Sequence, residues 1–289
     1  MGNGQEVIEM ATVAWNREIG PGLYWVSLDV PAIMSACVPR PGQFLHVLPG
    51  PGSELFMRRP LSVLDIDRER ARIELYVQVF GPGSRMIAGC AAGDRLDCLG
   101  SLGRGFTPAA PGGAIYMVAG GVGLAPLYFW WRELARAPGA PRVELLLGAR
   151  TADMIPGGGL LDELPGPVRI ATEDGSSGYR GTVIQLLDSL LDREDSTVEL
   201  AGCGPAAMLA ALEVVARRRS IRLQICMEQV MGCAMGACQG CVVPARLSGR
   251  RSGSGDGYAR VCTEGPVFEG GEVDWGSFTG QGHFAGSAR

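Results

Sequence analysis

The stretch Met231-Gly-Cys-Ala-Met-Gly-Ala-Cys-Gln-Gly-Cys241 brings three cysteines close together near the end of a chain of 289 residues. Four residues separate the first two cysteines, two separate the second from the third, and Cys262 follows after twenty more. This C-x4-C-x2-C…C spacing is that of plant-type [2Fe-2S] clusters, so we expect Cys233, Cys238, Cys241 and Cys262 to hold such a cluster. The small residues between them let the backbone approach a compact inorganic core and point amide N–H groups at sulfur.

Two other interpretations of these cysteines stay open. A structural zinc site also takes four cysteines, although more usually as two C-x2-C pairs, and ordinary buried thiols need no metal at all. The other cysteines lie among apolar neighbours, as in a reduced protein rather than a disulfide framework; they are Cys37, Cys90, Cys98, Cys203 and Cys226. The N-terminus lacks the charged and apolar regions of a signal peptide, so we expect a cytoplasmic protein.

Composition narrows the function classes. The net charge of −4 leaves no basic surface for nucleic acid. One uncharged run, residues 114–131, is long enough to cross a membrane, but its glycines and proline indicate a buried strand, a tight turn and a helix instead. No Ser/His/Asp set or paired carboxylate site supports hydrolysis, and His46 is expected to be a packed strand residue.

The pattern of elements changes near residue 113. Before it, short strands are expected at 8–15, 23–30, 44–48, 73–80 and 95–99 with a helix at 84–91, which indicates an antiparallel barrel or sandwich. After it, strands at 114–119, 143–147, 168–172 and 197–201 alternate with helices at 124–137, 181–191 and 206–218, which indicates a parallel sheet. We therefore expect an α+β multidomain protein, with units at 1–108, 109–222 and 223–270, a linker at 109–113, a mobile loop at 247–257 and a flexible tail at 271–289.

In the first unit, Arg59-Pro-Leu-Ser62 opens a strand and places a guanidinium, a rigid proline and a hydroxyl close together. Such a set can bind a phosphate and the edge of a flat ring, but a surface arginine on an edge strand explains it equally well. Gly81-Pro-Gly-Ser84 then opens a helix. Its free N–H groups could bind a second phosphate oxygen, or Ser84 could simply cap the helix.

In the second unit, Gly120, Gly121, Val122 and Gly123 follow the first strand and open a helix, which lets a dinucleotide pyrophosphate approach the backbone. The turn Cys203-Gly-Pro205 follows a later strand. It is expected at the carboxyl edge of the sheet, where open α/β folds bind ligands. The alternative is a tight buried turn that binds no ligand. The acidic pair Glu173 and Asp174 favours NAD over NADP, and Arg150 points the other way.

Together these motifs, in this order, resemble the ferredoxin reductase superfamily. The run from Met231 to Val243 and the phrase Val261-Cys-Thr-Glu-Gly-Pro-Val-Phe268 resemble the electron-transfer subunits of NAD-linked, two-subunit dihydroorotate dehydrogenases, over roughly residues 6–270. The resemblance implies an FAD-binding β-barrel, an NAD-binding α/β domain and a [2Fe-2S] segment. The implied site residues are Arg59, Pro60, Leu61, Ser62, Leu75, Tyr76, Val77, Gly83 and Ser84 for FAD; Gly120, Gly121, Val122, Gly123, Cys203, Gly204 and Pro205 for NAD, with Cys203 catalytic; and the four motif cysteines for iron. Leu61 departs from the family pattern, in which many members carry an aromatic residue that stacks on the flavin.

The same resemblance implies an electron-transfer function in pyrimidine biosynthesis. NAD would exchange a hydride with FAD, and FAD would exchange single electrons with the cluster. The cluster would face an FMN-containing dihydroorotate dehydrogenase catalytic subunit in a heterotetramer, against which Val242, Val243 and Phe268 are expected to bury. One alternative keeps the cofactors but changes the partner, as in sulfide dehydrogenases or NADH-dependent ferredoxin:NADP oxidoreductases. Another is a zinc-stapled or redox-sensing binding module.

Overall fold

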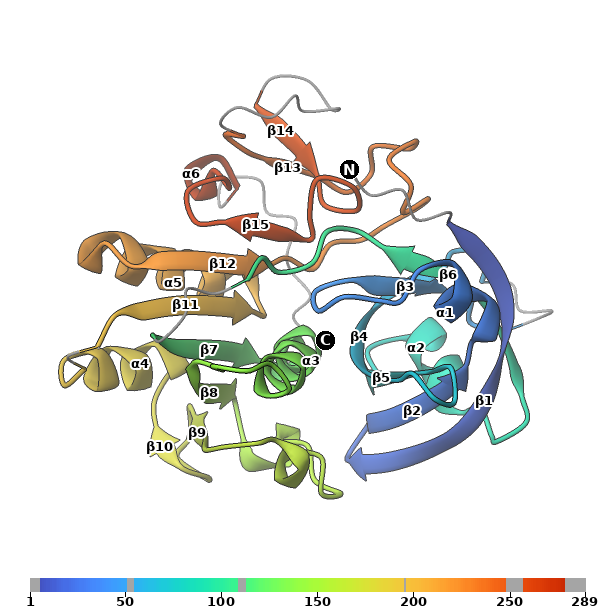
Figure 1. Cartoon of the computed structure of the whole chain (residues 1–289), viewed down its shortest axis with the longest axis horizontal. Coiled ribbons are helices and arrows are strands. Elements are labelled where there is room, and N and C mark those ends of the chain that lie inside the picture. The colour runs from blue at the N-terminus through green and yellow to red at the C-terminus, as the bar shows by residue number, and fades with distance from the viewer. Residues whose placement is uncertain (1–5, 51–54, 109–112, 195, 248–256, 279–289) are drawn as a thin grey trace.

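The structure is a computed structural model, and it describes residues 6–50, 55–108, 113–194, 196–247 and 257–278. A closed barrel forms one side of the molecule and a seven-stranded sheet the other, with a two-stranded sheet beside them (Figure 1). The expected α+β architecture, with an antiparallel barrel followed by a mostly parallel sheet, is confirmed.

The barrel consists of antiparallel strands that neighbour each other in the order β1-β2-β5-β4-β3-β6. Side chains alternate between the two faces of a strand, so Leu75 and Val77 fill the barrel while Tyr76 packs in the cluster shared with the sheet. The strand bounds are β1 Val7–Gly20, β2 Leu23–Asp29, β3 Phe44–Val47, β4 Arg59–Asp67, β5 Arg72–Gln78 and β6 Arg95–Leu102, and the helices of this part are α1 Pro31–Ala36 and α2 Pro82–Ala88.

The large sheet has the order β10-β9-β8-β7-β11-β12-β15, with parallel neighbours except for the antiparallel pair β12 and β15. Alternate residues of β7 face opposite sides: Met117 packs with the residues of α3, and Val118 with those of α4 and α5. The strand bounds are β7 Ala114–Gly120, β8 Arg142–Ala149, β9 Val168–Thr172, β10 Tyr179–Arg180, β11 Val198–Cys203, β12 Arg222–Cys226 and β15 Val267–Glu269. The helices are α3 Leu124–Ala135, α4 Val183–Leu191 and α5 Ala206–Arg219, with short 3-10 turns at Gly121–Gly123, Ala152–Met154 and Leu161–Glu163.

Helix α3 lies between the sheet and the barrel (Figure 1). Its Phe129 enters the barrel core, while Trp130 and Trp131 pack in the cluster that also holds Trp25 and Tyr76 of the barrel. Burial on all sides explains why the helix is so apolar. The strand, turn and helix expected at residues 114–131 are confirmed, and among the described residues no helix is long and apolar enough to cross a membrane.

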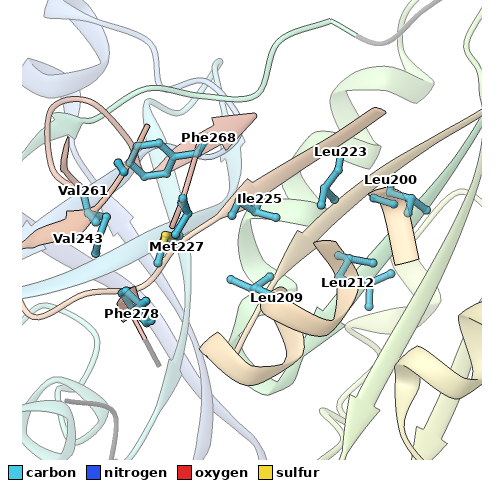
Figure 2. Close-up of a cluster of buried hydrophobic side chains, with 14 of the residues drawn as sticks. Leu200, Leu209, Leu212, Leu223, Ile225, Met227, Val243, Val261, Phe268 and Phe278 are labelled. Carbon is cyan, nitrogen blue, oxygen red and sulfur yellow. The ribbon is translucent and has the colours of Figure 1, made fainter. Parts of the chain in front are cut away.

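The C-terminal segment folds onto the sheet rather than apart from it. Its strands β13 Val242–Pro244 and β14 Tyr258–Arg260 pair with each other, and β15 then adds to β12. Figure 2 shows Val243, Val261 and Phe268 in one continuous apolar core with Ile225 and Leu223 of β12. The strand β12 therefore anchors this segment, although the unit boundaries proposed from the sequence stay predictions.

Two expectations about this segment are wrong. Val243 and Phe268, expected on a partner-facing surface, are buried in the core. The tail at 271–289 was expected to be flexible, but in its described part α6 Trp275–Phe278 is helical and Phe278 is buried. The linker residues 109–112, most of the expected mobile loop (248–256) and residues 279–289 lie outside the described residues.

Candidate redox site

The cluster loop, residues 231–241, is bent in ways that its side chains do not favour. Ala234 and Gln239 each have a φ of 58°. This left-handed conformation costs a non-glycine residue about 1–2 kcal/mol, so tertiary structure or function must impose it. The bends direct backbone N–H groups at sulfur: Cys238 donates to Cys233 Sγ at 3.3 Å, and Gly240 donates to Cys238 Sγ at 3.4 Å.

The four motif thiols lie as two pairs, Cys233 with Cys238 and Cys241 with Cys262. Burial opposes ionisation of Cys233, but backbone N–H groups, first that of Cys238, outweigh it and lower its pKa to about 7. Contact with Cys262 is the main cause that lowers the pKa of Cys241 to about 6, and the same contact raises the pKa of Cys262. The surroundings of Cys233 and Cys241 therefore favour the thiolate, the form of cysteine that binds iron.

A paired arrangement fits a [2Fe-2S] cluster, in which each iron takes two protein ligands. Among the described residues, no group of three His, Cys, Asp or Glu side chains is placed to hold a single metal ion. The missing side chain of Gly232 lets the backbone come close to sulfur, because a Cβ there would crowd Cys238 Sγ at 3.2 Å. The donor set, its spacing and its amide groups fit the cluster that the sequence predicted.

Part of the cluster loop reaches the surface. Cys241 and Cys262 are buried, whereas Cys238 is exposed. Beside it on the loop, Met235 is 49% exposed and Val230 just before the loop is 75% exposed. An electron could therefore leave or enter the cluster at an apolar surface.

The cluster loop also meets the barrel. A Cβ on Gly232 would lie 3.7 Å from the methyl carbon of Met57, which precedes β4. The backbone of Met231 lies beside His46 of β3, whose pKa burial chiefly lowers to about 4, so this ring is neutral at pH 7. His46 is fully buried, which confirms it as a packed strand residue.

The structure brings Arg59 and Gly83 together, although the sequence places them on different elements. A Cβ on Gly83 would lie 2.5 Å from Arg59 Nε, so the guanidinium covers the first turn of α2. Arg59 Nη1 donates to the carbonyl of Met57, and in the described part of the chain no carboxylate pairs with it. The adjacent Arg58 is instead bound to Asp97 at 2.7 Å. Of the two arginines, Arg59 is the one whose guanidinium lies at the start of α2.

The other residues expected at the FAD site differ in what they expose. Pro60, Leu61 and Ser62 follow Arg59 on β4 and are half-buried. Ser84 Oγ accepts from the N–H groups of Phe80 at 2.9 Å and Gly81 at 3.1 Å, so its hydroxyl caps the turn. The side chains of Leu75, Tyr76 and Val77 are buried in the two cores, so only their backbone is placed to contact a ligand.

The two turns expected to bind NAD pack directly against each other, because β7 and β11 are neighbours. A Cβ on Gly123 would overlap the carbonyl oxygen of Cys203, and one on Gly120 would lie 2.7 Å from Pro205 Cδ. Gly204, with a φ of 154°, would meet Gly120 at 2.9 Å. Gly121, with a φ of 55°, has open space beside it, so its backbone is the part of the turn that a ligand can approach.

The thiol of Cys203 itself is fully buried. It lies opposite Cys226 across β11 and β12, and contact with Cys226 and burial both raise its pKa. Its catalytic role stays a prediction, since the buried thiol touches no open surface.

The sequence analysis missed two features of the site. Arg260 and Glu264 form a salt bridge at 2.6 Å beside the cluster loop, and Met57 packs against that loop. The sequence signal for the salt bridge is that an arginine and a glutamate stand two residues before and two residues after Cys262. The packing of Met57 depends on how the barrel and the C-terminal segment meet, and no local sequence pattern predicts that contact.

Comparison with known proteins gives consistent matches. A family model described as the iron-sulfur cluster binding domain of dihydroorotate dehydrogenase B matches residues 228–274. The electron transfer subunit of dihydroorotate dehydrogenase B (NAD(+)) from Desulforamulus reducens is 35% identical over 257 residues, which cover 89% of this chain and 94% of that protein. The subunit of the same name from Shouchella clausii is 38% identical over 241 residues, covering 81% and 86%.

Among solved structures, a chain of an NADH-dependent reduced ferredoxin-NADP oxidoreductase, described in work on flavin-based electron bifurcation, superposes with a TM-score of 0.78. It is 26% identical, and the match covers 97% of this chain and 94% of that one. A ferredoxin NADP+ reductase from Neisseria gonorrhoeae with bound FAD and NADP has a TM-score of 0.60 at 17% identity over 76% of this chain and 98% of that one, which shows the shared fold.

Proposed function

The chain belongs to the family of the electron transfer subunits of dihydroorotate dehydrogenase B, and from that premise we propose that it carries electrons between NAD(H) and a partner subunit. The cofactors of this function are FAD, a [2Fe-2S] cluster and NAD. The partner is an FMN-containing catalytic subunit that oxidises dihydroorotate in pyrimidine biosynthesis, and the complex is a heterotetramer. The nine cysteines are all free thiols, which suits our proposal of a cytoplasmic location.

One observation supports this function above the others: the cluster loop is both packed against the barrel and exposed to solvent. It lies beside Met57, two residues before Arg59, and it exposes Cys238. A carrier between a flavin in the barrel and a separate protein requires such a position. A zinc staple or a redox-sensing module would not require the loop to contact the proposed flavin site.

The protein's own residues hold and orient the cofactors. When bound, these cofactors supply the conversion of a hydride transfer into single-electron transfers. Arg59 and the backbone at Gly83 would hold the FAD phosphates by charge-assisted hydrogen bonds. The backbone of the turn from Gly120 to Gly123 would hold the NAD pyrophosphate, with the Cys203-Gly-Pro205 turn packed behind it. Cys233, Cys238, Cys241 and Cys262 would hold the iron.

We propose the partner surface from exposure. Val230 and Met235 are exposed and lie within eight residues of the exposed Cys238 in the sequence. They take the place of Val243 and Phe268, which are buried in the core, as candidate contact residues. Burying apolar side chains beside an exposed ligand would exclude water from the electron-transfer path.

A second candidate has specific support from the fold. The NADH-dependent reduced ferredoxin-NADP oxidoreductase chain matches this one almost from end to end. Its identity of 26% is lower than the 35% and 38% of the dihydroorotate dehydrogenase B subunits, so it stands second. Co-purification from the source cell, followed by identification of the bound chain, separates the two partners.

The cluster assignment is tested by removing one ligand at a time. We expect Cys262→Ala to lose most of the iron and the low-temperature EPR signal of the reduced cluster. The matched control is Cys90→Ala, which removes a partly exposed thiol outside the motif and should change neither measurement. Full iron content in Cys262→Ala would remove Cys262 from the ligand set.

A further inference from the structure

Arg260, the last residue of β14, is tied to both sides of the cluster site. Its Nη1 donates to the carbonyl of Gly236 at 2.9 Å. Its Nε and Nη2 donate to the two carboxylate oxygens of Glu264 at 3.1 and 2.6 Å, and its backbone N–H donates to the same carboxylate at 2.6 Å. One guanidinium therefore links the cluster loop to the turn that carries Cys262.

Gly236 connects this arginine to the sulfur atoms. It lies between Cys233 and Cys238, and its peptide N–H faces the sulfur of Cys262 while its carbonyl accepts from Arg260. Its φ is 79°, and a Cβ there would lie 2.9 Å from Arg260 Nη1. The loop is thus shaped so that the guanidinium lies directly against its backbone.

The charge of Arg260 acts in a poorly solvated place. The side chains of Arg260 and Glu264 are only 19% and 9% exposed, and the guanidinium lies within electrostatic range of Cys241 and Cys262. Glu264 binds the Nε and Nη2 edge of the fork, and the Nη1 edge is turned to the loop. The positive charge is therefore interposed between the carboxylate and the loop, and low local dielectric strengthens its effect.

We propose that Arg260 is a positioning residue that raises the reduction potential of the cluster, and that Glu264 holds it in place and moderates its charge. This inference rests on the proposed function, since it requires a cluster on the four cysteines. Reduction adds one negative charge to the cluster, and a nearby fixed cation stabilises that state. Arg260 would thereby help the cluster accept electrons.

The test is potentiometric titration of the purified chain with its FAD and cluster, followed by the EPR signal of the reduced cluster. We expect Arg260→Gln to lower the midpoint potential by at least about 59 mV, which for one electron is a tenfold change in the equilibrium constant for reduction of the cluster. Glu264→Gln should raise the midpoint, because it removes a negative charge while the amide oxygen still accepts from the guanidinium. Arg260→Lys keeps the charge and should restore most of the potential.

The opposite signs separate an electrostatic role from a structural one. If Arg260 only supported the loop, Arg260→Gln and Glu264→Gln would shift the midpoint the same way or not at all, and either result overturns the proposal. Arg246→Gln is the matched control: that arginine belongs to the same segment but is 73% exposed and pairs with Asp274 at 3.0 Å, so the midpoint should not move. Should Arg260→Gln lose its iron, Glu264→Gln decides: a higher midpoint supports the proposal, and a lower or unchanged midpoint overturns it.

Failure of this inference differs from failure of the proposed function. A wild-type chain that shows no EPR signal of a reduced [2Fe-2S] cluster contradicts the proposed function. A wild-type chain with the cluster but unchanged potentials in both variants contradicts only the role of Arg260.

Discussion

Gly83 and Arg59 show how a single residue can shape a candidate site without contributing a side chain. Gly83 lies in the first turn of α2, and the space that its missing Cβ leaves is filled by the Arg59 guanidinium. The sequence predicted both residues as phosphate ligands, each on a separate weak pattern. It could not predict their contact, because that depends on the register of β4 and β5 in the closed barrel.

Gly83→Ala should therefore weaken FAD binding without changing any charge. The new methyl group would displace the guanidinium, and a charged hydrogen bond contributes about 1.5–3 kcal/mol, so we expect at least a tenfold loss of FAD affinity. The ratio of flavin absorbance to protein after dialysis measures it. Gly81→Ala is the control, because a Cβ there meets nothing within 4 Å and its φ of −159° suits any residue. Equal FAD content in the two variants would show that Arg59 does not bind the phosphates.

At the scale of elements, the C-terminal segment shows both the reach and the limit of the sequence. The cysteine spacing predicted the cluster because ligand spacing is local and chemically specific. The burial of Val243, Phe268 and Phe278 in the core could not be predicted in the same way, because an isolated apolar residue in a sequence is equally compatible with a core or with an interface. What decides it is that β15 pairs with β12, and this pairing brings the three side chains into one core (Figure 2).

Helix α5 fastens the end of this segment through Glu213, which is buried. Its Oε2 accepts from the N–H of Gly271 at 3.0 Å, just before α6. Glu213→Ala would remove this acceptor, and we expect a loss of about 1–2 kcal/mol in the free energy of unfolding. Thermal melting and the rate of iron release should both report it. Glu213→Gln keeps an acceptor oxygen and should behave much more like wild type; a loss of equal size in both variants would instead indicate that the charge, not the hydrogen bond, matters.

At the scale of the whole molecule, the barrel, the sheet and the cluster segment would carry out one of two half-reactions, the exchange of electrons with NAD(H). The described chain positions a candidate flavin site, a nucleotide turn and a cluster loop, and the proposed oxidation of dihydroorotate takes place on the partner. We therefore expect NADH to reduce artificial acceptors with this chain alone. Dihydroorotate-dependent reduction of NAD should appear only when the catalytic subunit is added.

That requirement makes the docking surface the most informative place to perturb the complex. Val230 is 75% exposed and lies just before the cluster loop, so a partner that delivers electrons near Cys238 would bury it. Val230→Asp would place a charge in that contact, and we expect at least a tenfold weaker affinity for the catalytic subunit, which is about 1.4 kcal/mol. Titration by calorimetry measures this affinity, while NADH-dependent reduction of an artificial acceptor should stay unchanged.

Val214→Asp is the matched control, because Val214 is 60% exposed on α5 and lies outside the proposed contact. If both variants bind the catalytic subunit as tightly as wild type does, the partner docks elsewhere and electrons must cross a different face of the cluster site.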